Sequence, residues 1–273
     1  MEPDLIDTRL DAIIRKALDE SEEPVLLIDP SEEAVTRLVR VAADRDDDPT
    51  TRVLADRRVL KSAMQDFIVA SNAADLIEQD RLELRTLDEE PDNSLLVTPS
   101  SVVALVETGS AVGGLTTDDD EFIEDAYRTF GETFETVEPF SMRTPPLSRV
   151  RETLAADVGH ETEADFSAVL SSLETAGGDG DGDGLDEVTV SLLVAAKNEV
   201  LLYDISRWGE EVGIASKATF SRTKTSLEDA GIIDTEKVPI DVGRPRLRLK
   251  LGDDRLEDAD GPQLATVAQS ILS

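Results

Sequence analysis

A segment near the C-terminal end of the chain carries hydrogen-bond donors of the kind that nucleic acids accept. The stretch Val212–Leu227 contains no Asp or Glu, and Phe220 and Leu227 would anchor one face of a helix predicted over Lys217–Asp229. The other face would offer Ser216, Lys217, Thr219, Ser221, Arg222 and Thr225. These side chains match base edges and phosphate oxygens, and hydroxyl groups can satisfy phosphates without charge at high salt. We predict that they bind the major groove of DNA.

A second acid-free stretch, Val242–Gly252, follows closely. In a strand predicted over Arg246–Leu251, alternation places Leu247, Leu249 and Leu251 inward and Arg246, Arg248 and Lys250 outward. We predict contacts with the DNA backbone or minor groove from Lys224, Arg244, Arg246 and Arg248. Each residue alone has a plainer interpretation, as an exposed polar side chain or as a charge that balances acids elsewhere. Their combination favours DNA binding.

The elements around these residues occur in the order of a winged helix-turn-helix. Two helices, predicted over 188–198 and 201–211, precede a tight turn at 212–215, where Gly213 can take the positive φ that such turns need. Ser216 is a good N-cap for the third helix, and Gly231 ends it. Strands over 232–240 and 246–251 complete the wing.

The charge of the chain is unevenly distributed. It has 273 residues with 60 Asp plus Glu against 27 Lys plus Arg, a net charge of −33, and Arg outnumbers Lys by 20 to 7. Dispersed acid with little lysine is typical of adaptation to molar salt, where a Debye length of about 3 Å screens self-repulsion. Residues 188–252 hold 10 basic and 9 acidic residues, a net of +1, whereas the remainder carries −34. The predicted DNA-binding segment is therefore the neutral part of a polyanion.

The same segment resembles a known family. The residues LLYDISRWGEEVGIASKATFSRTKTSLEDAGIIDTEKVPIDVGRPRLRLKL, Leu201–Leu251, look like the C-terminal part of the TbsP family, transcriptional regulators of halophilic archaea. The resemblance extends over most of the chain, including PVLLIDPSEEA near the N-terminus. It implies sequence-specific transcription regulation on double-stranded promoter DNA in a salt-rich cytoplasm, and it supplies no catalytic residues.

Residues 1–145 are predicted to form an α/β layer domain, because short apolar runs alternate with helical patterns. Expected strands cover 25–28, 52–55, 82–87, 94–98 and 102–107. Expected helices cover 4–19, a stretch that begins at Ser31, another that runs to about Gln79, and 118–136. The last of these would cover the sheet with Phe122, Ile123, Ala126, Tyr127, Phe130 and Phe134. By analogy, we expect this domain to sense a small-metabolite effector or to mediate dimers.

The rest of the chain divides at recognisable boundaries. Pro145-Pro146 marks the end of the first domain, residues 146–176 are predicted as a helical connector, and 177–187 as an acidic Gly/Asp linker. After the winged domain at 188–252, residues 253–273 are predicted to contain an amphipathic helix with Leu264, Val267, Ala268, Ile271 and Leu272 in its stripe. This stripe must be buried on its own chain or on a partner, and we expect a homodimer on a pseudo-palindromic site.

Enzyme classes find little support in the sequence. The chain has no cysteine, and His160 is its only histidine, so catalytic triads and paired HxK motifs of phospholipase-D-like enzymes are unavailable. Gly109–Gly114 has the spacing of a phosphate loop, but Leu115 stands in place of its lysine, and a hairpin is favoured. Asp179, Asp181 and Asp183 mimic a calcium loop that lacks its Glu, because Val190 takes that position. We expect no catalytic residue, metal, cofactor or membrane span; the rival function is an adaptor whose winged helix binds another regulator.

Overall fold

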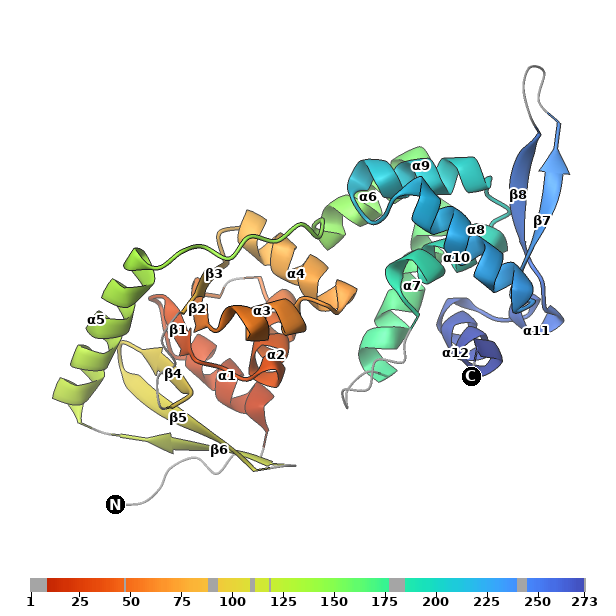
Figure 1. The fold of residues 1–273 in the computed structure, drawn as a ribbon. Helices are drawn as coiled ribbons and strands as arrows, with labels where there is room; N and C mark the ends of the chain where they lie inside the picture. Colours follow the sequence, from red (N-terminus) through yellow and green to blue (C-terminus); the bar gives the residue numbers. More distant parts are fainter. Residues whose placement is uncertain are drawn as a thin grey trace. The chain divides into compact units, whose positions relative to one another are not determined.

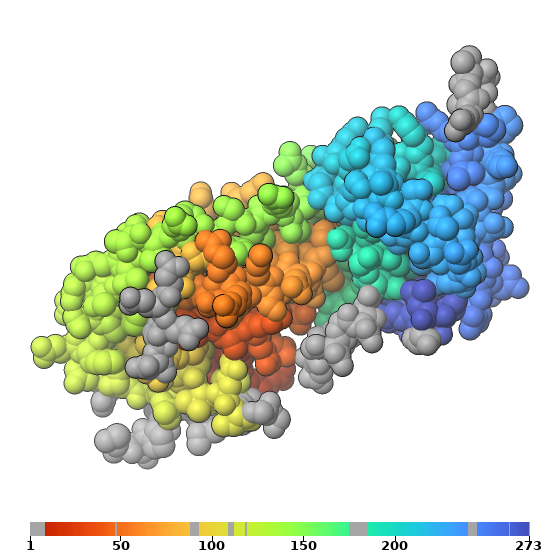
Figure 2. Space-filling view, viewed as in Figure 1, coloured from red at the N-terminus to blue at the C-terminus, as the bar shows by residue number. Residues whose placement is uncertain are grey.

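The computed structural model describes residues 9–46, 48–87, 93–108, 111–117, 119–176, 185–239 and 245–272. The chain folds as two compact units, Met1–Met142 and Arg143–Ser273 (Figures 1 and 2). Several parts of the sequence analysis lie outside the described residues: the start of the helix predicted over 4–19, the Gly109 turn, residues 177–184 of the predicted linker with the Asp179–Asp183 motif, and Arg244. No helix within the described residues is long and apolar enough to cross a membrane.

The first unit is built on a mixed sheet. Its described strands are β1 (Val25–Ile28), β2 (Thr51–Ala55), β3 (Leu82–Thr86), β4 (Leu95–Thr98), β5 (Ser101–Thr108) and β6 (Ala111–Thr116). They lie in the order β3-β2-β1-β4-β5-β6, with β1, β2 and β3 parallel and β4, β5 and β6 antiparallel. Every residue of β1 is buried, as expected for a strand that is covered on both faces. The glycine-rich stretch forms the β5–β6 hairpin, as predicted, in place of a phosphate loop.

Helices cover both faces of this sheet (Figure 1). One face packs against α1 (Leu10–Asp19), α2 (Glu32–Ala43), α3 (Arg57–Ala63) and α4 (Phe67–Glu78). The other face packs against α5 (Asp120–Thr136) through Ile123 and Phe134, as predicted. Two details differ from the prediction. The helical stretch that ends near Gln79 is two helices, because Asp56 and Asp66 each cap a new N-terminus. Phe122 is 55% exposed and belongs to no core.

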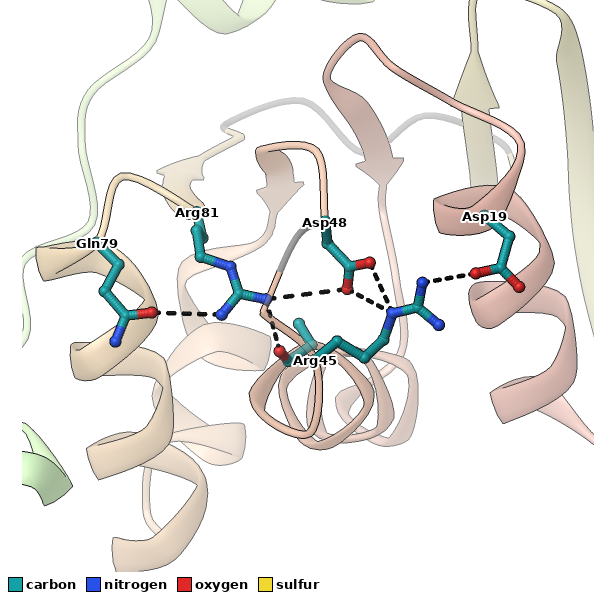
Figure 3. A network of polar contacts seen from close by, with 6 residues as sticks. Asp19, Arg45, Asp48, Gln79 and Arg81 are labelled. Atoms are coloured by element: carbon teal, nitrogen blue, oxygen red, sulfur yellow. Dashed lines mark hydrogen bonds and ion pairs between the residues drawn. The ribbon is translucent and has the colours of Figure 1, made fainter.

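A buried carboxylate joins the segments at the N-terminal ends of the parallel strands (Figure 3). The Asp48 side chain is only 4% exposed and accepts from Arg45 Nε at 2.6 Å, while Arg81 Nη2 lies 3.9 Å away. Arg45 also donates to Asp19 on α1, and Arg81 donates to the carbonyl of Ala42 at the end of α2. The hydrogen bonds that Arg45 donates to Asp48 and Asp19 raise the pKa of Arg45. The two guanidinium groups thus compensate a charge that would be costly to bury alone.

The second unit is helical, with one β-hairpin. Its elements are α6 (Leu147–Asp157), α7 (His160–Ala176), α8 (Glu187–Lys197), α9 (Leu202–Val212), α10 (Lys217–Asp229), β7 (Ile233–Val238), β8 (Arg246–Leu251), α11 (Asp254–Glu257) and α12 (Gly261–Leu272). The order α8, α9, turn, α10 and hairpin is a helix-turn-helix followed by a wing. The predicted fold class is therefore confirmed, and the three helices of the helix-turn-helix begin and end within about two residues of the predicted bounds. The helix predicted over 4–19 is shorter, because Arg9 is extended and α1 begins at Leu10.

The segments on either side of the helix-turn-helix are part of the same core. Trp208 on α9 is 1% exposed; its ring meets Phe166 of α7 edge-on at 6.4 Å, and its Nε1 donates to Thr153 Oγ1 of α6 at 2.9 Å. Residues 146–176 therefore do not form a separate connector. Helix α12 packs on α7 and buries Leu264 and Ala268 completely, so its apolar stripe is covered mainly by its own chain.

Candidate nucleic-acid interface

The turn between α9 and α10 has the geometry that the sequence predicted. Gly213 ends α9 with φ of 98°, a conformation that favours glycine. Ser216 caps α10 by accepting from the Thr219 amide at 3.2 Å. Gly209 lets the two helices approach closely, because a Cβ there would lie 2.3 Å from Cε2 of Phe220. At the far end of α10, Gly231 has φ of 74° and allows the chain to turn into β7.

The outer face of α10 is a row of small polar side chains around one arginine. We call this set the α10 face; its members are Ser216, Lys217, Thr219, Ser221, Arg222 and Thr225. All are exposed except Thr219, which is half-buried and shares a hydrogen bond of 3.0 Å with the Ser216 hydroxyl. The Thr225 hydroxyl donates to the carbonyl of Ser221 at 3.0 Å, which leaves its oxygen lone pairs as acceptors on the surface.

The two cations of the α10 face have different surroundings. The Arg222 guanidinium makes no ion pair or hydrogen bond with the described part of the chain, so its five donors face solvent. Lys217 is paired: its Nζ lies 2.7 Å from Oε2 of Glu210, on the preceding helix. This hydrogen bond raises the pKa of Lys217 and lowers the pKa of Glu210. Arg222 is therefore the cation of this face that can meet a ligand without first breaking an ion pair.

Lys224 does not lie on the outer face of α10, although the sequence suggested that it contacts DNA. Its side chain is 11% exposed, and its Nζ donates to Oε2 of Glu228 at 2.6 Å. The other oxygen of Glu228 accepts from Thr235 Oγ1 at 2.7 Å. Lys224 thus belongs to a bridge that holds the recognition helix against β7, and we leave it out of the proposed interface.

The basic face of β8 is neutralised along its length. Arg246 lies 3.7 Å from Asp204 and stacks at 4.2 Å over the ring of Tyr203. The other two cations are also paired, Arg248 with Glu199 at 3.8 Å and Lys250 with Glu236 at 2.8 Å. The alternation that the sequence predicted is present, with Leu249 fully buried on the opposite face. The ion pairs of these three cations nevertheless favour the plainer interpretation, in which the basic side chains balance nearby acids.

One exposed cation was missed by the sequence analysis. Lys237 on β7 pairs in register with Leu247, so it lies on the face of the hairpin that contacts α10, opposite to Arg246 and Arg248. It is exposed and makes no ion pair within the residues that the structure describes. The alternation Ile233, Thr235, Lys237 contains this signal, but the charged neighbour Glu236 obscures it.

A helix-turn-helix with an uncharged turn, a third helix that carries no acid before Glu228, and a hairpin wing defines a class, the winged helix-turn-helix regulators. The chain belongs to the TbsP-like transcriptional regulator family: the description "Transcriptional regulator TbsP-like, N-terminal" matches residues 2–145, and "Transcriptional regulator TbsP-like, C-terminal HTH domain" matches residues 146–269. It is a family of transcriptional regulators and not of enzymes, as predicted.

Other comparisons add little. No curated protein matches. Among solved structures, the chain is similar to TrmBL2, an archaeal chromatin protein described as showing a novel mode of DNA binding, with 20% identity and a TM-score of 0.36; the match covers 48% of this chain and 50% of that one. It is also similar to Nuc, a phospholipase D family member from Salmonella typhimurium, with 10% identity and a TM-score of 0.35 over 48% and 90% of the two chains. Likenesses of this size carry no argument about function.

Proposed function

We propose that this regulator binds promoter DNA sequence-specifically, with α10 in the major groove. The observation that carries the proposal is the α10 face, where the unpaired Arg222 is flanked by the hydroxyl groups of Ser221 and Thr225 and by no acid on the same helix before Glu228. A guanidinium group can donate two parallel hydrogen bonds to O6 and N7 of guanine, a contact that discriminates by about 1–3 kcal/mol.

The α10 face also suits binding in a salt-rich cytoplasm. At molar salt, neutralising phosphates releases few additional counterions, so each Lys or Arg contact with the backbone gives little affinity. Hydroxyl groups can donate to phosphate oxygens without a net charge. In the free protein Thr225 donates to the Ser221 carbonyl, and Ser216 and Thr219 share a hydrogen bond, so Ser221 is the hydroxyl of this face whose proton has no partner within the described residues. A surface with one free guanidinium and several hydroxyls relies on short-range hydrogen bonds, which salt screens less than long-range attraction.

The wing is assigned a supporting role. Arg244 and Arg246 flank Pro245 at the start of β8, and Lys237 lies on the face of the hairpin that contacts α10. Lys237 carries an uncompensated charge within the described residues and is proposed to contact the DNA backbone. Arg246 and Arg248 would have to exchange their carboxylate partners for phosphates, which reduces their net contribution.

The N-terminal unit is the proposed place of a small-metabolite effector. A pocket lies along the edge strand β3 and is lined by both apolar and charged side chains, among them Leu84, Phe140, Asp80, Glu83 and Arg85. Such a lining suits a small molecule with an apolar body and a charged group.

Genome-wide immunoprecipitation at native salt tests the proposed function. A regulator should enrich a small set of promoters that share a sequence motif, and Arg222→Ala should abolish this enrichment in a protein that remains folded. An adaptor that binds another regulator would keep its enrichment when Arg222 is replaced, or would show none. Either result would refute direct reading of DNA by α10.

A further inference from the structure

Strand β6 (Ala111–Thr116) is the last strand of the described sheet of the first unit. It pairs with β5 on one side and has no strand on the other within the residues that the structure describes (Figure 1). In general, the outer edge of such a strand offers N–H and C=O groups, such as those of Val112 and Gly114 here, as a template for pairing with another strand.

This edge lacks the features that usually prevent such pairing. Proteins protect edge strands with charged residues, especially lysine, or with proline. Residues 108–117, TGSAVGGLTT, contain neither, although 32% of the whole chain is charged. Strand β6 itself, Ala111–Thr116, is wholly uncharged, and in a protein with a net charge of −33 it is a surface that another polyanion can approach.

The sheet next to this edge is also apolar and uncovered. Helix α5 contacts β1, β4 and part of β5. Beyond it, Leu115 is 60% exposed and Val106 is 44% exposed, and the register places both on the α5 side of the sheet. Val106 lies opposite Gly113, which has no side chain to cover it. Exposed apolar side chains beside an open edge indicate an interaction surface.

We propose that β6 pairs antiparallel with β6 of a second copy of this chain, across a twofold axis perpendicular to the sheet. The two sheets would then continue into one another, and the Leu115 and Val106 side chains of both copies would lie on the same side of the joint. A second copy is the occupant that the charge favours, because the strip meets its own uncharged equivalent and no acid is placed against acid. Helix α12, the dimer element suggested by the sequence, buries its stripe mainly on α7.

Two substitutions test the edge without DNA. Leu115→Asp introduces a carboxylate on the apolar side of the sheet, where pairing of the two β6 strands would bury it. Gly113→Glu introduces a second such carboxylate, two residues earlier on the same strand. Gly113 tolerates a side chain, because the nearest atom to an added Cβ is the Val106 carbonyl oxygen at 4.0 Å. The matched control is Leu272→Asp, which changes an exposed leucine on α12 (47% exposed).

Light scattering of the full chain in molar KCl measures the molar mass and hence the number of chains in the assembly. The wild type and Leu272→Asp should have about twice the 29.6 kDa mass of one chain, whereas Leu115→Asp and Gly113→Glu should be monomers with unchanged circular dichroism. A monomeric wild type, or dimers in both β6 variants, would overturn the proposal, and a monomeric Leu272→Asp would move the interface to α12. The result is independent of DNA binding, since folded monomers of the β6 variants should still bind a single half-site with the Arg222 dependence of the wild type.

Discussion

The α10 face and strand β8 both come from acid-free stretches of a strongly acidic chain, yet their basic side chains have different surroundings. On α10, Arg222 has no partner within the described residues. On β8, Arg246, Arg248 and Lys250 each lie within 4 Å of a carboxylate. A local absence of acid in the sequence is therefore not the same as a free positive charge in the fold.

The basic side chains of β8 are paired because the fold brings acids from distant parts of the sequence next to them. The partners of Arg246 and Arg248 are Asp204 and Glu199, which precede β8 by more than 40 residues and lie at the start of α9 and just before it. On the outer face of α10, the ion pair found among the described residues is that of Lys217 with Glu210. The comparison predicts that DNA affinity depends strongly on α10 and weakly on β8.

The largest expected effect is on Arg222. Arg222→Ala should lower specific DNA affinity by about 5-fold to 150-fold, because a bidentate contact with a base is worth about 1–3 kcal/mol. Fluorescence anisotropy with a promoter fragment at native salt measures the change. Arg58→Ala removes the same charge from an exposed site on α3 and should leave the affinity unchanged. An equal loss in both variants would mean that only the net charge matters.

The next effect is on the helix crossing that presents α10. Gly209→Ala places a Cβ 2.3 Å from the buried ring of Phe220, and overpacking of this kind costs about 1–3 kcal/mol of unfolding free energy. Thermal or denaturant unfolding at native salt measures the cost. Gly131→Ala is the control, because no atom lies within 4 Å of the added Cβ on α5. Equal stability of the two variants would contradict the close approach of α9 and α10.

A smaller effect, of opposite sign in two variants, is expected at the Lys217–Glu210 pair. Glu210→Gln removes the carboxylate that holds Lys217 and should strengthen DNA binding, whereas Lys217→Ala should weaken it. Each change should alter the slope of log affinity against log salt by about one phosphate contact, in opposite directions. Titrations at several KCl concentrations measure the slopes. Unchanged slopes in both variants would place Lys217 outside the interface.

The same pair predicts a flat pH response. The hydrogen bond from Lys217 lowers the pKa of Glu210 below its usual value of 4.5. A carboxylate with a depressed pKa keeps its interaction above that usual value and loses it as the pH falls through the depressed pKa. The pair therefore stays intact between about pH 6 and pH 8, and DNA affinity should not change there through Glu210. A steep increase in DNA affinity as the pH falls from about 8 to about 6, present in the wild type and absent in Glu210→Gln, would contradict this assignment.

Much of this architecture could be predicted from the sequence, since it depends on local patterns. The Ser216 cap, the positive φ of Gly213 and the end of α10 at Gly231 follow from neighbouring residues. The β5–β6 hairpin also agreed with the prediction.

The features that were missed depend on tertiary packing. Trp208 joins α6 and α7 to the helix-turn-helix core through Thr153 and Phe166, and nothing near residues 146–176 in the sequence indicates this contact. Lys224 has the spacing of an exposed residue, but its side chain forms an ion pair with Glu228 and is buried beneath the α10 face. With 60 acids in the chain, the sequence does not indicate which of them meets a given arginine.

The most direct test of the account compares two arginines in cells. Promoter occupancy by genome-wide immunoprecipitation at native salt should be lost in Arg222→Ala and retained in Arg248→Ala, because the first guanidinium is free and the second is held by Glu199. Retained occupancy in folded Arg222→Ala, or its loss in Arg248→Ala alone, would contradict the claim that α10 and not β8 reads the DNA.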